Sequence, residues 1–256
     1  MRALVKLGGT LLDELTSRNR LARELAKLAE SHQLAIVHGG GKQMTRFLAE
    51  RGVESQFVDG LRVTTPDVVD ALLKVFAGSV NHELVSAFVG AGARAVGLTG
   101  IDASLAMAEQ MDPRLGAVGR ITESNAGLLE HLVAGGFLPV VACVAGGSQG
   151  EVFNVNADQM AVACAAAFQV ESLIFLTDVD GVRGSKGETL PSLSVAECQS
   201  LIQAGVATGG MQAKLTAACD AIRHGVRQVV IAPGARRGAA AAALQQAAEI
   251  GTRIHG

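Results

Sequence analysis

The chain has 256 residues, which is enough for one large α/β domain or two fused lobes with a substantial core. Its formal net charge is −2, it has no dense Lys/Arg block, and it lacks Trp and Tyr, so the sequence disfavours a nucleic-acid partner. The apolar runs are far too short to span a membrane, and no signal segment precedes the first strand. These features predict a cytoplasmic protein with no membrane partner.

The cysteines and histidines indicate neither disulfides nor a metal site. The four cysteines lie far apart in apolar or helical contexts without CxxC spacing, so we expect reduced packing residues. The six histidines lack the spacing of zinc ligands. No protein-bound metal is therefore predicted.

Short apolar strands alternate with amphipathic helices along the whole chain. In chain order we expect a strand at 4–7, a helix at 15–30, a strand at 34–38, a helix at 42–51, a helical stretch at 66–89 broken near Gly78, a strand at 94–98, a hairpin at 105–110 and 118–122, a helix at 125–134, a strand at 138–144, a helix at 156–168, a strand at 173–176, a glycine-rich hairpin at 182–189, a helix at 194–203, a helix at 211–223, a strand at 228–231 and a final alanine-rich helix. This alternation predicts a mainly parallel sheet covered on both faces, with any second lobe continuing the same sheet.

Candidate site residues follow the ends of these strands, where open α/β sheets bind ligands. Lys6 ends an apolar strand and is followed at once by Gly8 and Gly9. Burying its ammonium group costs several kcal/mol, at order of magnitude, unless a partner compensates the charge. The position therefore predicts an anionic partner for Lys6.

A second glycine cluster, His38–Lys42, follows a strand and opens a helix. Free backbone N–H groups and the positive end of the helix dipole then meet at one place, as in an anion site. Tight turns that happen to use glycine are the alternative. No GxxxxGK[ST] motif is present, and the glycines at 90 and 92 end a helix rather than open one, so neither a P-loop nor a dinucleotide fingerprint is predicted.

Three further motifs each allow an ordinary structural explanation. Asn156 and Asp158 suit the start of a helix, although a simple cap does not need Asn154. Lys214 lies in the first turn of a helix, where a cation opposes the dipole unless an anion occupies that space. Arg62 suits a bidentate contact with a carboxylate, but an exposed arginine is equally compatible with its position.

Taken together, these motifs resemble the amino acid kinase family, and within it the members that act on N-acetyl-L-glutamate. The matching stretches run in the family's order across nearly the whole chain: VKLGG (5–9), VHGGGK (37–42), DGLRVT (59–64), FNVNADQ (153–159), LTDVDGV (176–182) and TGGMQAK (208–214). The resemblance implies an open three-layer αβα sandwich with a mainly parallel central sheet. It also implies an N-terminal lobe at 1–170 for the acyl amino acid and dimerisation, and a C-terminal lobe at 171–256 for ATP.

The resemblance implies a role for each matched residue. Lys6 and Lys214 are similar to the lysines that stabilise the transferring phosphoryl group, and Asp158 to the aspartate that holds both. The substrate-binding positions are Gly40, Gly41, Arg62 and Asn154. The nucleotide-binding positions are Gly8, Gly9, Thr177, Asp178, Val179, Asp180, Gly181, Val182, Val206, Ala207 and Thr208.

The implied reaction is phosphorylation of the γ-carboxylate of N-acetyl-L-glutamate by ATP with Mg²⁺, a step of arginine biosynthesis. A carboxylate is already ionised at pH 7, so no general base is required, and catalysis reduces to alignment and charge neutralisation. Only five residues precede Lys6, where arginine-inhibited members carry an additional helix, so we expect a homodimer without arginine feedback. A kinase for a carrier-linked aminoadipate or glutamate, or a non-catalytic binding protein on the same fold, are the alternatives.

Overall fold

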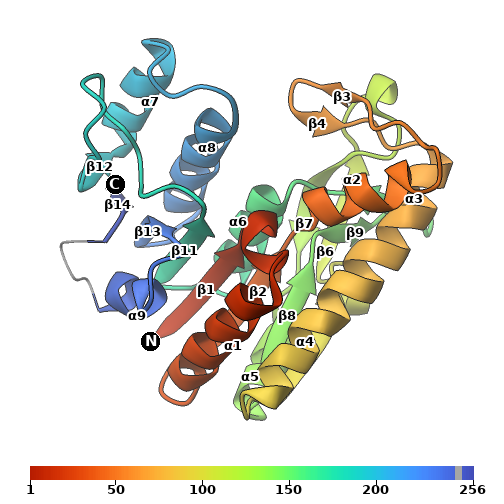
Figure 1. Ribbon diagram of the computed structural model, residues 1–256, viewed down its shortest axis with the longest axis horizontal. Coiled ribbons are helices and arrows are strands. Elements are labelled where there is room, and N and C mark those ends of the chain that lie inside the picture. The colour runs from red at the N-terminus through yellow and green to blue at the C-terminus, as the bar shows by residue number, and fades with distance from the viewer. Residues whose placement is uncertain (246–249) are drawn as a thin grey trace.

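The computed structural model describes residues 1–245 and 250–256, and an eight-stranded sheet crosses the molecule (Figure 1). Its strands follow the order β12 (Ser192–Ser194), β14 (Thr252–His255), β13 (Gln228–Pro233), β11 (Ser172–Thr177), β1 (Arg2–Leu7), β2 (Gln33–His38), β8 (Leu138–Ala142) and β5 (Ala95–Thr99). All neighbours pair in parallel except β13 with β14. The predicted mainly parallel sheet is confirmed.

Helices cover both faces of this sheet, as the alternation of elements predicts. They are α1 (Leu15–Ala29), α2 (Gly41–Ala49), α3 (Pro66–Leu72), α4 (Asn81–Gly90), α5 (Gly127–Ala134), α6 (Ala157–Ala167), α7 (Val195–Gln203), α8 (Gly209–Arg223) and α9 (Ala239–Leu244), with short 3₁₀ turns η1 (Gly9–Leu12), η3 (Asp102–Ser104) and η4 (Pro113–Leu115). The three-layer sandwich is confirmed. None of these helices has the length and apolar character that crossing a membrane requires.

The central strands are buried on both faces, which explains their continuous apolar sequence. Every residue of β11 and β13 is buried, and in β1 only Arg2 is partly exposed. The helix α6 packs on β1, β2 and β11, whereas α4 packs on β5 and β8. All four cysteines are buried and unpaired, as expected.

The predicted break near Gly78 is wrong. The chain instead continues from α3 through a π-helix, η2 (Leu73–Val80), directly into α4. A π-helix has i→i+5 hydrogen bonds, so it widens the turn without ending the helix. The side chains of Phe76 and Val80 are thereby buried beside the glycine loop that follows β2.

The predicted single strand at 138–144 is also wrong, because the chain forms two separate strands there. The strand β8 ends at Ala142, and β9 (Val144–Gly146) belongs to a second sheet of order β10 (Val152–Asn154), β9, β6 (Ala106–Gln110) and β7 (Gly119–Ser124). Because residues on both sides of Cys143 are fully buried, the apolar pattern carries no sign of the change of sheet. The predicted pairing of 105–110 with 118–122 is confirmed as the antiparallel pair β6–β7.

Several short strands have no sequence signal strong enough for prediction. These are β10, β12, β14 and the two-residue strands β3 (Phe57–Val58) and β4 (Leu61–Arg62). The expected hairpin at 182–189 is reduced to one antiparallel bridge between Arg183 and Thr189. The final alanine-rich helix is present as α9, and β14, which follows it, lies between β13 and β12 in the sheet.

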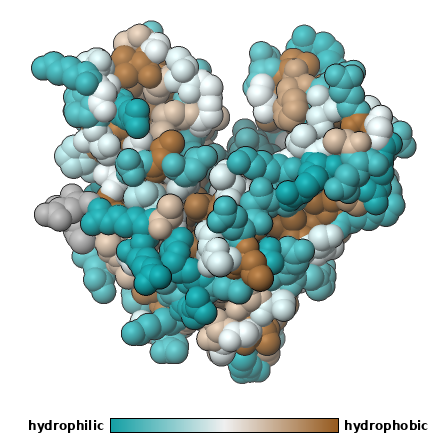
Figure 2. All heavy atoms as spheres, in the orientation of Figure 1, coloured by the Kyte–Doolittle hydropathy of each residue, from teal (hydrophilic) through white to brown (hydrophobic). Residues whose placement is uncertain are grey.

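The order of strands divides the sheet between β1 and β11. Strands from residues 2–142 form one half, and strands from residues 172–255 form the other. The surface is hollowed between these halves, with α7 and α8 rising on one side and β3 and β4 on the other (Figures 1 and 2). A ligand at the carboxyl ends of the central strands would lie in this hollow.

Candidate active site

Three charged side chains from distant parts of the chain meet at the centre of the molecule. Lys6 projects from β1, Asp158 from the first turn of α6 and Lys214 from α8. The Nζ of Lys6 lies 2.8 Å from Asp158 Oδ1, and the Nζ of Lys214 donates a hydrogen bond of 2.8 Å to Asp158 Oδ2. Two ammonium groups therefore share one carboxylate and leave a net positive centre.

This cluster is largely buried, so its charges interact strongly. The side chains of Lys6, Lys214 and Asp158 are 11%, 13% and 10% exposed. Burial would raise the pKa of Asp158, but the charges of the two lysines outweigh it and lower that pKa. Burial is also the main cause that lowers the pKa of Lys214, against the opposing attraction of Asp158.

The contact between Lys6 and Asp158 is a buried ion pair. Lys6 Nζ lies 2.8 Å from Asp158 Oδ1, and both the charge of Lys6 and its hydrogen bond lower the pKa of Asp158. An ammonium group has three N–H donors. Lys6 can therefore donate to a second, anionic acceptor while it remains next to Asp158.

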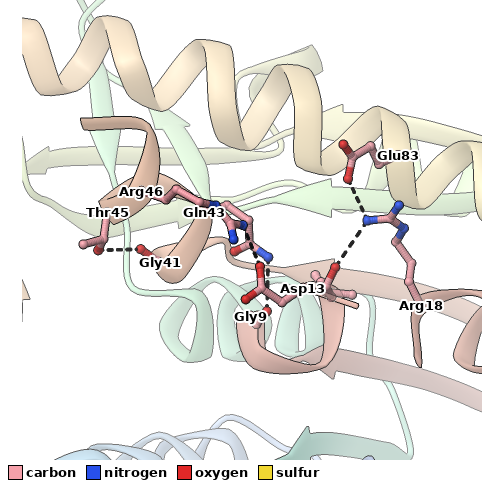
Figure 3. Close-up of polar contacts among 9 residues, drawn as sticks. Gly9, Asp13, Arg18, Gly41, Gln43, Thr45, Arg46 and Glu83 are labelled. Atoms are coloured by element: carbon pink, nitrogen blue, oxygen red, sulfur yellow. Dashed lines mark hydrogen bonds and ion pairs between the residues drawn. The ribbon is translucent and has the colours of Figure 1, made fainter. Parts of the chain in front are cut away.

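The segment after β1 is held by side chains of α2 and α1, and the α1 side chain is paired in turn with α4 (Figure 3). Gln43 Nε2 donates to the carbonyl oxygen of Gly9 at 3.3 Å, and Arg46 forms a 2.7 Å ion pair with Asp13. On the other side, Arg18 pairs with Glu83 at 2.6 Å and also donates to the Leu12 carbonyl oxygen at 3.3 Å. These contacts fix the backbone next to Lys6.

The first glycine pair, Gly8 and Gly9, does not offer two free backbone donors to a nucleotide. The N–H of Gly8 donates to the Leu176 carbonyl oxygen at 3.0 Å, so it is not available to a phosphate. A Cβ at Gly8 would lie 3.2 Å from the same oxygen, so a larger residue would be crowded there. Gly9 lies against the second glycine loop, because a Cβ there would be 3.5 Å from the Gly41 nitrogen.

The second glycine loop, Gly39–Gly41, joins β2 to α2. A Cβ at Gly40 would lie 2.9 Å from the ring of Phe76, and one at Gly39 would lie 3.2 Å from the Cβ of Ala157. A Cβ at Gly41 would meet nothing within 4 Å. Packing therefore excludes a side chain at Gly40 and leaves little room for one at Gly39, whereas Gly41 faces open space at the start of the helix.

Arg62 is buried among neutral groups. Its guanidinium donates to Ser55 Oγ, to Thr45 Oγ1 at 2.8 Å and to the Gly41 carbonyl oxygen at 3.1 Å. Its Cζ also lies 4.7 Å from the centre of the Phe57 ring. Within the described residues Arg62 has no carboxylate partner, and burial lowers the pKa of its guanidinium. A bound carboxylate would supply the missing negative charge.

Asn154 lies next to the same region. Its Nδ2 donates to Thr64 Oγ1 at 3.0 Å, and this hydroxyl donates in turn to the Arg62 carbonyl oxygen at 2.9 Å. Asn156 caps α6 by accepting from the N–H groups of Asp158 and Gln159. The cap interpretation is therefore right for Asn156, and capping fixes the turn that carries Asp158.

The segment after β11 contains both exposed and internal residues. Thr177 is buried and its hydroxyl donates to Asp178 Oδ1 at 3.1 Å, while Asp178, Val179 and Asp180 are exposed. Asp178 is close enough to Lys214 for its charge to act on the lysine. Gly181 and Val182 are instead packed inside the lobe, and the Val182 N–H donates to Thr252 Oγ1 at 2.8 Å.

The other expected nucleotide segment connects α7 to α8. Val206 is 37% exposed, Ala207 is buried, and Thr208 precedes the first turn of α8 without a side-chain cap. Gly209 has a φ of 53°, which glycine adopts without strain. This segment leads directly into the helix that carries Lys214.

Sequence reasoning missed the residues that support this site from a distance. Thr45 and Ser55 hold Arg62, Gln43 holds Gly9, and Asn81 contacts His38. Thr45 and Gln43 lie in the first turns of α2, so their nearness to the glycine loop was a usable signal. Ser55 and Asn81 meet their partners only through tertiary folding.

The parallel sheet, the glycine loops and the buried cationic centre define an α/β protein with a site for an anionic group at the sheet's carboxyl edge. The chain belongs to the amino acid kinase family, whose sequence pattern it matches over residues 1–233.

Two bacterial acetylglutamate kinases are similar to this chain over almost their whole length. The acetylglutamate kinase of Solibacter usitatus is 61% identical over 255 residues, covering 99% of each chain. The acetylglutamate kinase of Deinococcus radiodurans is 44% identical over 254 residues, covering 98% of this chain and 99% of the relative.

Solved structures have the same fold. N-acetylglutamate synthase of Neisseria gonorrhoeae, solved with coenzyme A and N-acetyl-glutamate, superposes with a TM-score of 0.86 at 26% identity, covering 100% of this chain and 59% of that one. Carbamate kinase of Giardia lamblia, at 16% identity and a TM-score of 0.74, covers 99% of this chain and 98% of its own, and shows the likeness of fold alone.

Proposed function

We propose that this protein transfers the γ-phosphoryl group of ATP to the γ-carboxylate of N-acetyl-L-glutamate, a step of arginine biosynthesis. The observation that carries the proposal is the pair of ammonium groups of Lys6 and Lys214, both 2.8 Å from the carboxylate of Asp158. Relatives named acetylglutamate kinase, 61% and 44% identical over nearly the full chain, support this choice of acceptor.

The reaction is an in-line displacement that needs alignment and charge neutralisation. The acceptor carboxylate attacks the γ-phosphorus, the bond to the β,γ-bridging oxygen breaks, and ADP leaves as an acyl phosphate forms. Lys6 and Lys214 stabilise the charge on the equatorial oxygens, and Asp158 keeps both ammonium groups in place. No proton is abstracted from the acceptor, because it is already ionised.

The acceptor is proposed to bind on the side of the glycine loop. Arg62, which has no carboxylate partner among the described residues, supplies a guanidinium for the α-carboxylate, and Gly40 and Gly41 supply backbone N–H groups. Asn154 adds a polar contact, since its amide donates to the Thr64 hydroxyl, which donates in turn to the Arg62 carbonyl oxygen. In this proposal the acyl amino acid binds in the lobe formed by 1–170.

ATP is proposed to bind in the lobe formed by 171–256, as its complex with Mg²⁺. The exposed residues Thr208, Val206 and Asp178–Asp180 are the candidates for direct contact, and Gly9 faces the phosphates from the other lobe. Gly8, Gly181, Val182 and Ala207 act through the shape of the backbone, because they are packed or already bonded internally.

We further propose a cytoplasmic homodimer. The apolar edge strand β5 supports a second copy as its partner, because it ends the central sheet with only part of its surface buried. Light scattering at several protein concentrations tests this proposal, and a monomer at every concentration would overturn it.

The activity is tested by incubating the protein with ATP, MgCl₂, N-acetyl-L-glutamate and hydroxylamine. An acyl phosphate is trapped as a hydroxamate, and we expect hydroxamate only when acceptor and ATP are both present. Parallel reactions contain L-glutamate, N-acetyl-L-aspartate or N-acetyl-L-aminoadipate. Hydroxamate with one of these and none with N-acetyl-L-glutamate would assign a different acceptor, and none with any acceptor would favour a binding protein.

A further inference from the structure

One buried titratable side chain next to the site has no part in the proposed reaction. His38 ends β2 immediately before the glycine loop, and its side chain has no exposed surface. Its Nδ1 lies 2.8 Å from the Gly39 carbonyl oxygen, and its Nε2 lies 2.9 Å from Nδ2 of Asn81. Asn81, the first residue of α4, is itself 1% exposed.

The partners of these two side chains determine where the imidazole carries its proton. The Nδ2 of Asn81 also lies 2.9 Å from the Val140 carbonyl oxygen, which only accepts, so this atom must be the amide nitrogen. It therefore donates to His38 Nε2, which must be unprotonated. At the other end the Gly39 oxygen also only accepts, so Nδ1 carries the proton. Both ends of the chain of contacts specify the same neutral tautomer.

The Nδ1–H donor fixes the orientation of the peptide between Gly39 and Gly40. The peptide bonds are trans, so the carbonyl of Gly39 and the N–H of Gly40 point in opposite directions. With the carbonyl held by His38, the Gly40 N–H points away from the imidazole. It donates to no acceptor in the described part of the chain and is free for a ligand.

Glycines have no side chain to hold this peptide, so its orientation depends on outside contacts. Gly39 and Gly40 are both buried, and packing against Ala157 and Phe76 restricts their Cα atoms. Neither contact prevents rotation of the intervening peptide plane. Without the imidazole, the buried Gly39 carbonyl would lose its donor and the peptide could rotate to find another.

We propose that His38 is a positioning residue for the acceptor site. Its Nδ1–H holds the Gly39 carbonyl so that the Gly40 N–H is aimed at the bound anion, and Asn81 selects the tautomer that can do this. The inference rests on the proposed function, because it assigns the ligand of the Gly40 N–H to the acceptor or the transferring phosphoryl group.

Two substitutions of His38 separate this role from simple packing. In His38→Asn the amide nitrogen can take the place of Nδ1 and donate to Gly39, but the contact with Asn81 is lost. In His38→Gln the longer side chain can accept from Asn81, but the donor to Gly39 is lost. Each variant loses one buried hydrogen bond, so we expect similar losses in thermal stability.

Steady-state kinetics and calorimetric binding of N-acetyl-L-glutamate then distinguish the variants. We expect His38→Asn to keep kcat/KM for the acceptor within about threefold of wild type. His38→Gln should lose about 10-fold or more, since displaced anion-stabilising donors cost up to roughly 10²–10³. The KM for ATP should change little in either. Equal kcat/KM values in the two variants would overturn the proposal.

A measurement on the unmodified protein tests the tautomer directly. Nitrogen-15 NMR of the wild type, with the His38 signal assigned by its absence in His38→Asn, should show a neutral ring protonated at Nδ1. A ring protonated at Nε2 would refute the role of Asn81. A wild type that forms no hydroxamate would overturn the proposed function and this role with it, whereas an active wild type with indistinguishable variants overturns only the role of His38.

Discussion

Replacing Asp158 with asparagine tests the central feature of the site. Asparagine has nearly the same shape as aspartate, so the substitution removes charge without creating a cavity. It leaves the ammonium groups of Lys6 and Lys214, only 11% and 13% exposed, without their shared carboxylate. Removing one partner of a buried ion pair costs about 3–5 kcal/mol. We expect a loss of that size in the free energy of unfolding at neutral pH, and a fall in kcat of roughly 10²-fold or more.

The pH dependence of this loss follows from the direction of the pKa shifts. In the wild type the lowered pKa of Asp158 means that its stabilising contribution is present above the unfolded pKa and is lost as pH falls through the folded pKa. In Asp158→Asn the pKa of Lys214, already lowered by burial, loses the opposing effect of the carboxylate and falls further. The unfolded chain then binds more protons than the folded one, so the stability of the variant rises with pH.

Urea unfolding of both proteins at neutral and at alkaline pH measures these effects. The matched control is Asp220→Asn, which removes a carboxylate from an exposed pair with Arg223, also 2.8 Å long. Exposed pairs contribute about 0–1 kcal/mol, so the control should hardly change. If Asp158→Asn lost no more stability than the control, or if its deficit did not narrow with rising pH, the assigned role of the buried carboxylate would be wrong.

Four further substitutions have outcomes that the structure predicts. Gly41→Ala should keep the melting temperature, because its Cβ meets nothing within 4 Å, and should raise KM for the acceptor. Gly40→Ala should lower the free energy of unfolding by about 1–3 kcal/mol, because its Cβ would lie 2.9 Å from Phe76. Thermal melts and steady-state kinetics compare the two variants. Arg62→Lys should raise the acceptor KM by about tenfold with little change in kcat, and an unchanged KM would exclude the contact. Burial lowers the pKa of His38 from 6.5 to about 4. The wild type should therefore lose about 3 kcal/mol of its free energy of unfolding as pH falls across that interval. Urea unfolding of His38→Asn should lack this contribution to the pH dependence.

The central sheet was predictable because its strands are buried on both faces and therefore read as continuous apolar runs. The same property hid the change of sheet at Cys143, where residues before and after are all buried. The π-helix at 73–80 was missed for a related reason, because Gly78 indicates a break locally while the packing of Phe76 and Val80 favours a continuous helix.

The charged centre was predictable from the cost of burying Lys6 at the end of a strand. That argument requires a partner but does not identify it, and Asp158 followed from the family pattern rather than from spacing. The sequence offered no means of predicting which backbone N–H groups are already hydrogen-bonded, as the Gly8 N–H is to the Leu176 carbonyl oxygen. The contact of His38 with Asn81 joins residues 43 positions apart, and neither position alone indicates it.

The position of Asp158 gives the site a property that neither lysine could provide. Lys6 belongs to one half of the sheet, Lys214 lies on a helix of the other half, and α6 packs on strands of both halves, β1 and β11. A relative movement of the halves would separate the ammonium groups unless each followed the carboxylate between them. Because Asp158 lies in the first turn of a helix capped by Asn156, its own position is fixed by backbone contacts. The carboxylate therefore determines the positions of both ammonium groups. For this reason, removing it should lower kcat more than removing any single contact with the acceptor.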